Sequence, residues 1–256
     1  MNTSLRLLSV TFDTQIDPWE LPRFRGAVAR KVGLEHEWYH NHNAETDGYH
    51  QRYPLIQYKL DTHCGQQRPM LLCINQGVEE AHHFFSQPDW SLRIGANEHP
   101  LRIARLHVDQ LALDVSPQPF IYRIHKWKAF NPENYEIWQG LRGIAEQFAF
   151  LERLLATHII AFAEGVGWRV AERFELKILD LLKREQISNK GIRFEAFTLD
   201  FETNLALPEY VGLGKGVALG FGVVRRQTII EKNKKHDQNN LHLPNSHSAR
   251  YERRIG

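Results

Sequence analysis

The sequence contains few cysteines and no long apolar run, and both absences limit what kind of protein it encodes. Of its 256 residues two are cysteines, Cys64 and Cys73, and they do not form a CxxC pair. We therefore expect neither a disulfide framework nor a cysteine-based zinc finger. No apolar run approaches the ~18 residues that span a membrane, and the first ten residues lack the apolar core of a secretory signal. These features predict a soluble, cytoplasmic protein with no membrane partner.

Net charge is almost absent as well. The chain has 32 basic and 30 acidic residues, a net charge of +2, which argues against binding nucleic acid with the whole surface. The balance changes along the chain, from −3 over residues 1–115 (11 Lys and Arg, 14 Asp and Glu) to +5 over residues 225–256 (8 and 3). Residues 231–256 are polar, Asn-rich and basic. We interpret them as a mobile tail, with an arm that follows an RNA backbone as the alternative.

Apolar periodicity predicts an α+β protein with two tandem domains. Hydrophobic residues make up 42% of the chain, enough to bury a core at this length. Within a first domain (1–115), strands are expected over 5–13, 53–60, 69–75 and 101–115, helices over 19–32 and 78–86, and a polar loop over 36–52. This β-α-β-β-α-β order is that of a ferredoxin-like fold.

A second domain, residues 120–230, follows a predicted linker at 116–119, where two prolines favour extended backbone. Its expected elements are a strand over 120–128, a helical region over 131–164 with a break near two glycines, strands over 174–183 and 192–203, and a closing segment over 217–230. The pattern supports a second, less regular β-α-β-β unit.

Five glycines are concentrated in residues 212–222, GLGKGVALGFG, which we call the glycine segment. Glycine allows positive φ and close backbone approach, and N–H groups in such loops can converge on phosphate oxygens. Lys215 adds a positive charge at the centre of the segment. Neither a Walker A motif nor a strand–GxGxxG–helix dinucleotide motif is present. A glycine-rich hairpin and a phosphate-binding loop both remain possible interpretations.

The spacing Gly-x-Gly, five residues, Gly-hydrophobic-Gly resembles the glycine-rich loop of the RAMP superfamily, which includes the CRISPR-associated repeat-RNA endoribonucleases of the Cas6 family. The stretches FRGAV (24–28), HNH (40–42) and RYPLIQYK (52–59) resemble the N-terminal half of the b-type branch of that family. Residues 154–168 and 210–225 resemble its C-terminal half. The resemblance covers residues 5–230 and leaves the tail outside.

This resemblance implies two tandem ferredoxin-like domains and metal-independent cleavage of CRISPR precursor RNA within its repeats. The product would be a guide RNA with a repeat-derived 5′ handle. The partners it implies are the repeat RNA, as precursor and as mature guide, with a CRISPR interference complex as a further candidate. No cofactor and no metal are expected. One alternative is a non-catalytic RNA-binding subunit of a CRISPR ribonucleoprotein complex. Another is an unrelated metalloenzyme that uses the chain's 14 histidines.

Histidines are the natural candidates for metal-free RNA cleavage. A base must deprotonate the 2′-hydroxyl, a donor must stabilise the charge on phosphorus, and an acid must protonate the leaving 5′-oxygen. His40 and His42 lie two residues apart after the first helix, and in extended backbone they would point to the same side. In the family the catalytic histidine often lies in or after this helix, so the resemblance favours the same pair. The alternative is that both merely belong to a polar loop.

Other histidines carry weaker predictions. His82 and His83 fall on a short helix and are expected to point apart, and His158 is expected to be a satisfied structural histidine on an apolar helix. His63 next to Cys64 lacks a second pair at ligand spacing.

The candidate RNA-binding residues are cations of the first helix and second strand together with the glycine segment. A solvated basic face is the alternative for the helix. The set is Arg23, Arg25, Arg30, Lys31, Arg52, Lys59, Gly212, Gly214, Lys215, Gly216, Gly220 and Gly222.

Overall fold

The computed structural model describes residues 4–40, 42–43, 48–49, 52–62, 65–170, 172–189 and 192–227. Residues up to 226 form one unit, whose described part contains two four-stranded sheets and two two-stranded ones, and a second unit begins at residue 227. The predicted tail and the His63–Cys64 pair lie outside the described residues. Within the described ranges, no helix has the length and apolar character needed to cross a bilayer.

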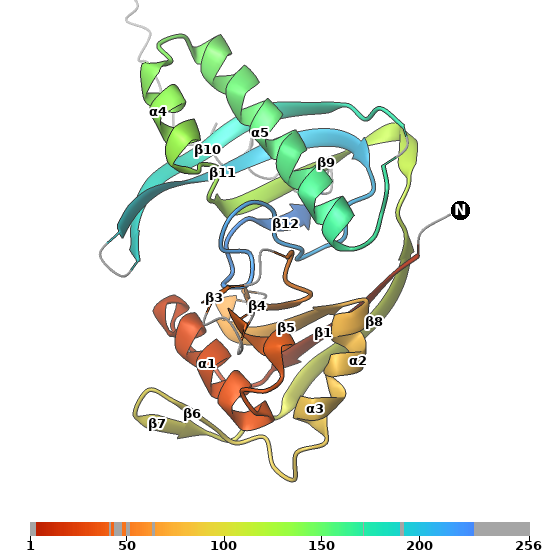
Figure 1. Ribbon diagram of the computed structural model, residues 1–256, viewed down its shortest axis with the longest axis vertical. Helices are drawn as coiled ribbons and strands as arrows, with labels where there is room; N and C mark the ends of the chain where they lie inside the picture. Colours follow the sequence, from red (N-terminus) through yellow and green to blue (C-terminus); the bar gives the residue numbers. More distant parts are fainter. Residues whose placement is uncertain are drawn as a thin grey trace, which may run out of the picture. The chain divides into compact units, whose positions relative to one another are not determined.

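The N-terminal half consists of a four-stranded antiparallel sheet with helices packed on it (Figure 1). Its strand order is β4-β5-β1-β8. The elements are β1 (Ser4–Phe12), η1 (Pro18–Glu20), α1 (Leu21–Val32), η2 (Glu37–Tyr39), β2 (His42–Asn43), β3 (Gly48–Tyr49), β4 (Ile56–Asp61), β5 (Arg68–Ile74), α2 (Gln76–Glu80), α3 (His82–Phe85), β6 (Leu92–Ile94), β7 (Asn97–His99) and β8 (Ile103–Ala112).

Helix α1 confirms the periodicity that predicted it. Leu21, Phe24, Val28 and Val32, spaced three or four residues apart, are all buried. The helix ends at Gly33, whose φ of 114° an L-residue rarely adopts. The exposed residues of α1 therefore lie on the face away from the sheet.

The C-terminal half contains the second sheet, in the order β10-β11-β9-β12. Counted along the chain, the strands of both sheets are arranged second-third-first-fourth. The elements are β9 (Val115–Trp127), α4 (Pro132–Gly140), α5 (Ile144–Gly165), β10 (Leu176–Asn189), β11 (Ile192–Leu205) and β12 (Val223–Arg226).

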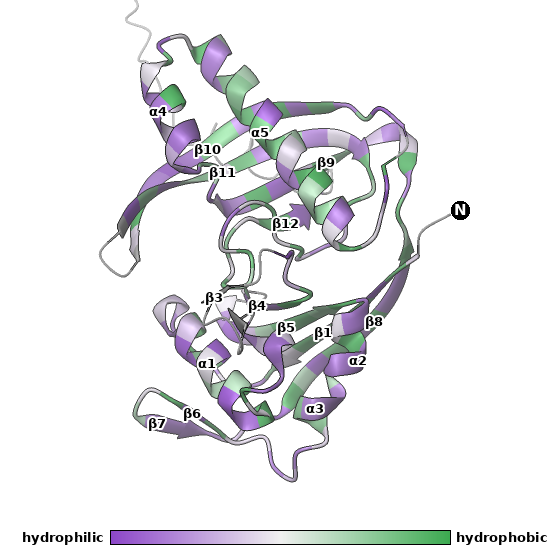
Figure 2. Cartoon of the chain, viewed as in Figure 1, coloured by the Kyte–Doolittle hydropathy of each residue, from purple (hydrophilic) through white to green (hydrophobic). Residues whose placement is uncertain are grey.

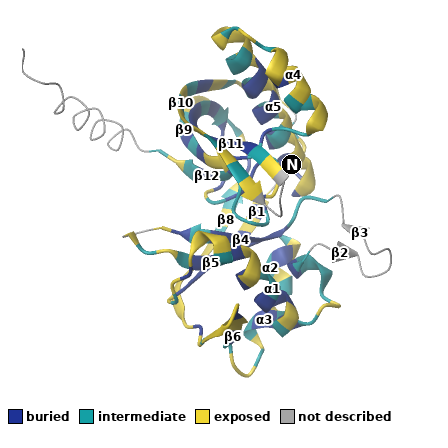
Figure 3. Ribbon diagram, turned by 90° about the vertical axis from the view of Figure 1, so that its left-hand side faces the viewer, coloured by how far each residue is buried: buried dark blue, intermediate teal, exposed yellow. Residues whose placement is uncertain are grey.

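Helix α5 covers one face of this second sheet. It buries Leu151, Leu155, Ile159 and Phe162, and hydrophobic and hydrophilic positions alternate along it (Figure 2). Buried residues likewise alternate with exposed ones along α5 (Figure 3). The break that two glycines predicted before this helix is confirmed, because α4 ends at Gly140 and α5 begins at Ile144.

Three predictions about local structure are wrong. The predicted linker 116–119 lies inside β9. The register between β9 and β11 shifts between the pairs Val115–Leu205 and Phe120–Thr203. Both prolines lie in this interruption of the ladder, where the strand needs no backbone N–H to pair. The predicted loop 36–52 contains η2 and the short pair β2–β3. The predicted helix 78–86 is two short helices, α2 and α3.

Candidate functional site

The stretch 53–59 attaches the glycine segment to the N-terminal sheet. The Tyr58 backbone N–H donates to the carbonyl of Ala218 (3.1 Å). The Gly212 N–H donates to Oε1 of Gln57 (3.1 Å), and the Tyr53 hydroxyl donates to the Gly212 carbonyl (2.7 Å). Strand β4 and the residues just before it therefore hold the glycine segment at Gly212 and at Ala218.

The base of the glycine segment is a hairpin. The Leu213 N–H donates to the Gly222 carbonyl (2.9 Å), and the Val224 N–H donates to the Val211 carbonyl (2.9 Å). Gly222 has a φ of +62°, and a Cβ there would overlap the carbonyl oxygen of Leu213. The base of the glycine segment is therefore the glycine-rich hairpin that was one of the two interpretations. At its tip, the Lys215 N–H donates to the Lys128 carbonyl (3.2 Å).

Lys59 does not lie on the surface, which contradicts its predicted role as an RNA contact. Its side chain has 0% exposure and its Nζ donates to the Val217 carbonyl (2.7 Å). Burial lowers the pKa of the Lys59 ammonium to about 7. Lys59 is therefore a buried residue that links β4 to the glycine segment. Its position in an alternating strand does not indicate that it is buried.

The buried Lys59 predicts that the free energy of unfolding rises with pH above about 7. Between its folded pKa of about 7 and its ordinary value of 10.5 the unfolded chain binds the extra proton. Stability therefore increases with pH, with a slope approaching about 1.4 kcal/mol per pH unit. Urea unfolding between pH 7 and about 7.8 stays below the ordinary pKa of thiols (about 8.5) and phenols (about 10) in the unfolded chain. In Lys59→Met this component of the slope should vanish, and an equal slope in both proteins would contradict the assignment.

His40, the first of the two predicted catalytic histidines, directly follows the helix η2. His40 follows η2 with φ −128° and ψ −4°, so its backbone is not extended and the argument that pairs it with His42 by alternation does not apply. Its Nε2 lies 2.8 Å from the Leu34 carbonyl, and its own carbonyl accepts a hydrogen bond from Arg25. His42 lies in β2, opposite Tyr49, and its side chain is outside the described part of the structure.

Two further contacts fix η2 in place. The Tyr39 side chain is buried and its hydroxyl donates to the Glu80 carbonyl (2.8 Å). The Tyr58 hydroxyl donates to the Tyr39 carbonyl (3.0 Å). Tyr58 therefore contacts η2 through its side chain and the glycine segment through its backbone, which couples the two parts of the candidate site.

A cavity of ≈630 Å³, which we call the Arg52 cavity, opens between these parts. It brings together two predicted RNA-binding residues, Arg52 and Gly214. The lining residues are Trp38, Arg52, Tyr53, Pro54, Leu55, Ala161, Glu164, Gly165, Gly214 and Val217. The Arg52 guanidinium lies 3.9 Å from the Trp38 ring centre. Its Nη2 lies 3.9 Å from Oε2 of Glu37, and its Nε and Nη2 are buried without a hydrogen bond to any described residue. The side chain as a whole is 35% exposed, so the cavity wall carries a positive charge that an anionic group can approach.

The remaining predicted cations of α1 do not form one site. Arg23 and Arg30 are exposed, and Arg23 lies 4.6 Å from the ring centre of Trp19. Lys31 forms an ion pair with Asp89 (2.9 Å). Arg25 donates to the His40 carbonyl. Two cations of α1 are therefore exposed to solvent, and the other two, Arg25 and Lys31, bind neighbouring residues of the protein.

A third group surrounds the tip of the glycine segment, and nothing in the sequence connected His158 or Trp127 with this tip. The Trp127 Nε1–H donates to Nδ1 of His158 (3.1 Å), which confirms His158 as a satisfied structural histidine. Burial, with the Lys215 charge nearby, lowers the pKa of His158 to about 4. Lys128 lies 3.6 Å from the ring centre of Phe194. Burial and the charge of Lys215 lower the pKa of Lys128.

The prediction that His82 and His83 point apart is wrong. Their ring centres are 3.8 Å apart, and the ring of His83 is equally close to that of His36 (3.8 Å). Two short helices that meet at Ala81 replace the regular helix on which the prediction rested.

Comparison with known proteins gives matches along the described chain. A family model for the Cas6b N-terminal domain matches residues 3–112, and one for the Cas6b C-terminal domain matches residues 114–227. A crystal structure of Cas6b superposes with a TM-score of 0.78 at 23% identity, covering 88% of this chain and 100% of the other. A CRISPR RNA processing endoribonuclease, Cas6b, gives a TM-score of 0.67 at 20% identity with the same coverage. An uncharacterized protein of Methanocaldococcus jannaschii is 29% identical over 103 residues, which is 40% of this chain and 69% of that protein.

Proposed function

The chain belongs to the Cas6b family, and from this membership we propose that it is an endoribonuclease that cuts CRISPR precursor RNA within its repeats. A structure described as a CRISPR RNA processing endoribonuclease shares its fold. The observation that carries the proposal is the Arg52 cavity, which places a guanidinium against Trp38 of η2, the short helix that directly precedes His40. The substrate would be repeat RNA, and the glycine segment would contact its backbone through the tip around Gly214, Lys215 and Gly216.

The hydrogen bond of His40 suggests its role in proton transfer. A carbonyl oxygen only accepts, so the 2.8 Å contact with Leu34 requires Nε2 to carry the hydrogen. In the neutral ring Nδ1 is then the atom that can accept a proton, and His40 would act as the general base. His42 remains the candidate acid.

In the proposed step, His40 takes the proton of the 2′-hydroxyl and that oxygen attacks the adjacent phosphorus. Arg52 stabilises the negative charge that develops on the phosphorane oxygens. The protonated His42 donates its proton to the 5′-oxygen as the P–O bond breaks. The products are a 2′,3′-cyclic phosphate and a 5′-hydroxyl, and the step requires neither a metal ion nor a cofactor.

We further propose that both sheets are ferredoxin-like. The shared second-third-first-fourth strand order supports this, as do the helices that connect the first two strands of each sheet. In the C-terminal sheet the connection from β11 to β12 contains the glycine segment in place of a second helix. Of the cations predicted to bind RNA, Arg23 and Arg30 stay candidates because they are exposed.

The proposal is tested with repeat RNA in excess EDTA, alongside the same RNA carrying a 2′-deoxy nucleotide at the cut site. We expect cleavage of the first to a cyclic phosphate and no cleavage of the second. Binding without cleavage, with or without divalent ions, would make the chain a non-catalytic RNA-binding subunit. Cutting of the 2′-deoxy RNA, or activity lost in EDTA and restored by Mg²⁺, would contradict the mechanism.

A further inference from the structure

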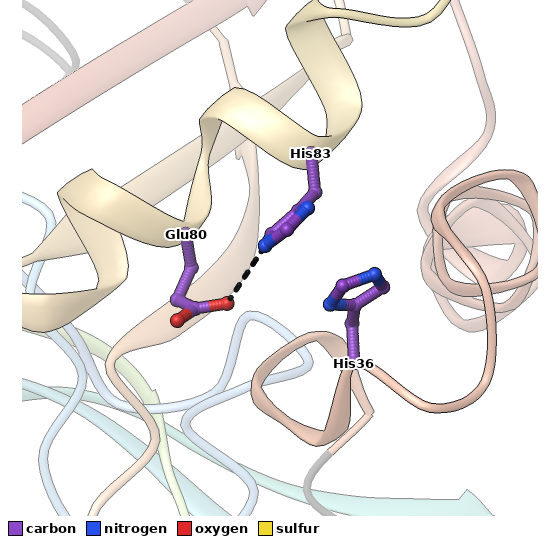
Figure 4. Close-up of side chains that lie close together, drawn as sticks. All are labelled: His36, Glu80 and His83. Atoms are coloured by element: carbon purple, nitrogen blue, oxygen red, sulfur yellow. Dashed lines mark ion pairs between the residues drawn. The ribbon is translucent and has the colours of Figure 1, made fainter.

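Three side chains that the proposed reaction does not use lie together beside η2. His36, Glu80 and His83 each offer a ligand atom, and these atoms lie within 4.8 Å of one another, the one such group of three among the described residues. The Nε2 of His83 is 3.6 Å from Oε2 of Glu80. Figure 4 shows His83 and Glu80 projecting from neighbouring turns toward His36, which faces them from the opposite segment.

The fold holds these three residues in place from two separate segments. Glu80 is the last residue of α2 and His83 lies in α3, and the 3.6 Å between their side chains places them on the same side. His36 is the residue that precedes η2. The hydrogen bond from the Tyr39 hydroxyl to the Glu80 carbonyl ties these segments together. The site therefore does not depend on one flexible loop.

We propose that His36, Glu80 and His83 form a binding site for a divalent transition-metal ion of the zinc class. Two imidazoles and one carboxylate are a ligand set that zinc uses when it keeps a fourth position open. In a tetrahedral zinc site neighbouring ligand atoms are about 3.3 Å apart, close to the 3.6 Å already present between Glu80 and His83. Small side-chain rotations would bring His36 to the same separation.

The surroundings of the three residues favour a cation. Their side chains are 25% (His36), 18% (Glu80) and 30% (His83) exposed, which leaves room for ion entry and for a water ligand. The exposed carboxylate of Glu35 lies 4.0 Å from Nε2 of His36 and adds a second negative charge.

Such an ion would join η2 to α2 and α3. It would hold the start of the three-residue helix whose other end is His40, and it would take no part in proton transfer. Its role is structural, so the RNA cleavage proposed above is expected to persist in EDTA.

The test is a titration of the metal-free, full-length protein with Co²⁺, followed by visible absorption and then by displacement with Zn²⁺. We expect one equivalent to bind with the intense bands of a tetrahedral site. His36→Ala and His83→Ala should each weaken Co²⁺ binding by more than about 100-fold, because loss of an outer-shell partner alone costs about 10- to 100-fold. Glu80→Gln, which keeps the size of the side chain, should weaken it as well.

Two controls separate this site from the other histidines. His107→Ala, on the exposed strand β8, and a combined His236→Ala, His242→Ala and His247→Ala variant should bind Co²⁺ like the parent. Circular dichroism verifies that each variant folds. The proposal is overturned if no saturable equivalent binds, or if Co²⁺ binding survives in the His36, Glu80 and His83 variants. Because RNA is absent from the titration, either result leaves the proposed cleavage untouched.

Discussion

Replacement of His40 by alanine is expected to slow repeat-RNA cleavage by about 10²- to 10⁴-fold while RNA binding changes by less than about threefold. The proposed general base is lost, whereas the Arg52 cavity and the glycine segment, which would hold the RNA, are unchanged. Single-turnover cleavage and a filter-binding assay on the same RNA measure the two quantities separately.

A second substitution separates chemistry from structure at His40. Glutamine at this position can still donate to the Leu34 carbonyl, which His40 contacts at 2.8 Å, but it cannot take up a proton. His40→Gln should therefore be as slow as His40→Ala. His107→Ala, whose side chain is 65% exposed, should cleave normally. Near-normal cleavage by His40→Gln would show that His40 only positions its neighbours.

Replacement of Gly222 by alanine is expected to lower the free energy of unfolding by about 2–5 kcal/mol. A left-handed backbone costs an L-residue about 1–2 kcal/mol, and forcing a methyl group into a packed site costs about 1–3 kcal/mol more. The added Cβ would meet the carbonyl oxygen of Leu213 at a φ of +62°. Because this contact closes the hairpin below the tip, RNA binding should weaken as well.

Gly167 provides the matched control for that prediction. It also has a positive φ, +77°, but a Cβ there would meet nothing within 4 Å. Gly167→Ala should therefore lower the free energy of unfolding only by the cost of a left-handed backbone at an L-residue, about 1–2 kcal/mol. Urea unfolding of the two variants measures the difference, and equal losses would mean that the close approach to Leu213 contributes nothing.

The sequence predicted the elements whose apolar spacing is regular. Helices α1 and α5 and strand β1 follow from local periodicity, because each buries one face. The prolines at 117 and 119 predicted a linker where the chain forms a strand, because a gap in the β9–β11 ladder accommodates them without breaking the strand. Such a gap depends on the partner strand and cannot be seen in a local window.

The parts of the site were predicted less well than the fold. The glycine segment was found because its composition is unusual, but the burial of Lys59 depends on residues more than 150 positions away (Val217). The contact of His36 with His83 joins two segments 47 positions apart, and no local pattern marks it. The placement of Arg52 against Trp38 is equally a product of tertiary structure.

The position of β4 in its sheet has a consequence for solubility. It is the outermost strand beside β5, and an outer strand with free N–H and C=O groups is a template for pairing with other molecules. The parallel bridge between Tyr58 and Leu219 covers this edge with the glycine segment. A chain that released the segment would expose Ile56 and Tyr58, both buried, along an unpaired edge. The contact between β4 and the glycine segment, which organises the candidate site, therefore also blocks an edge through which two molecules could pair.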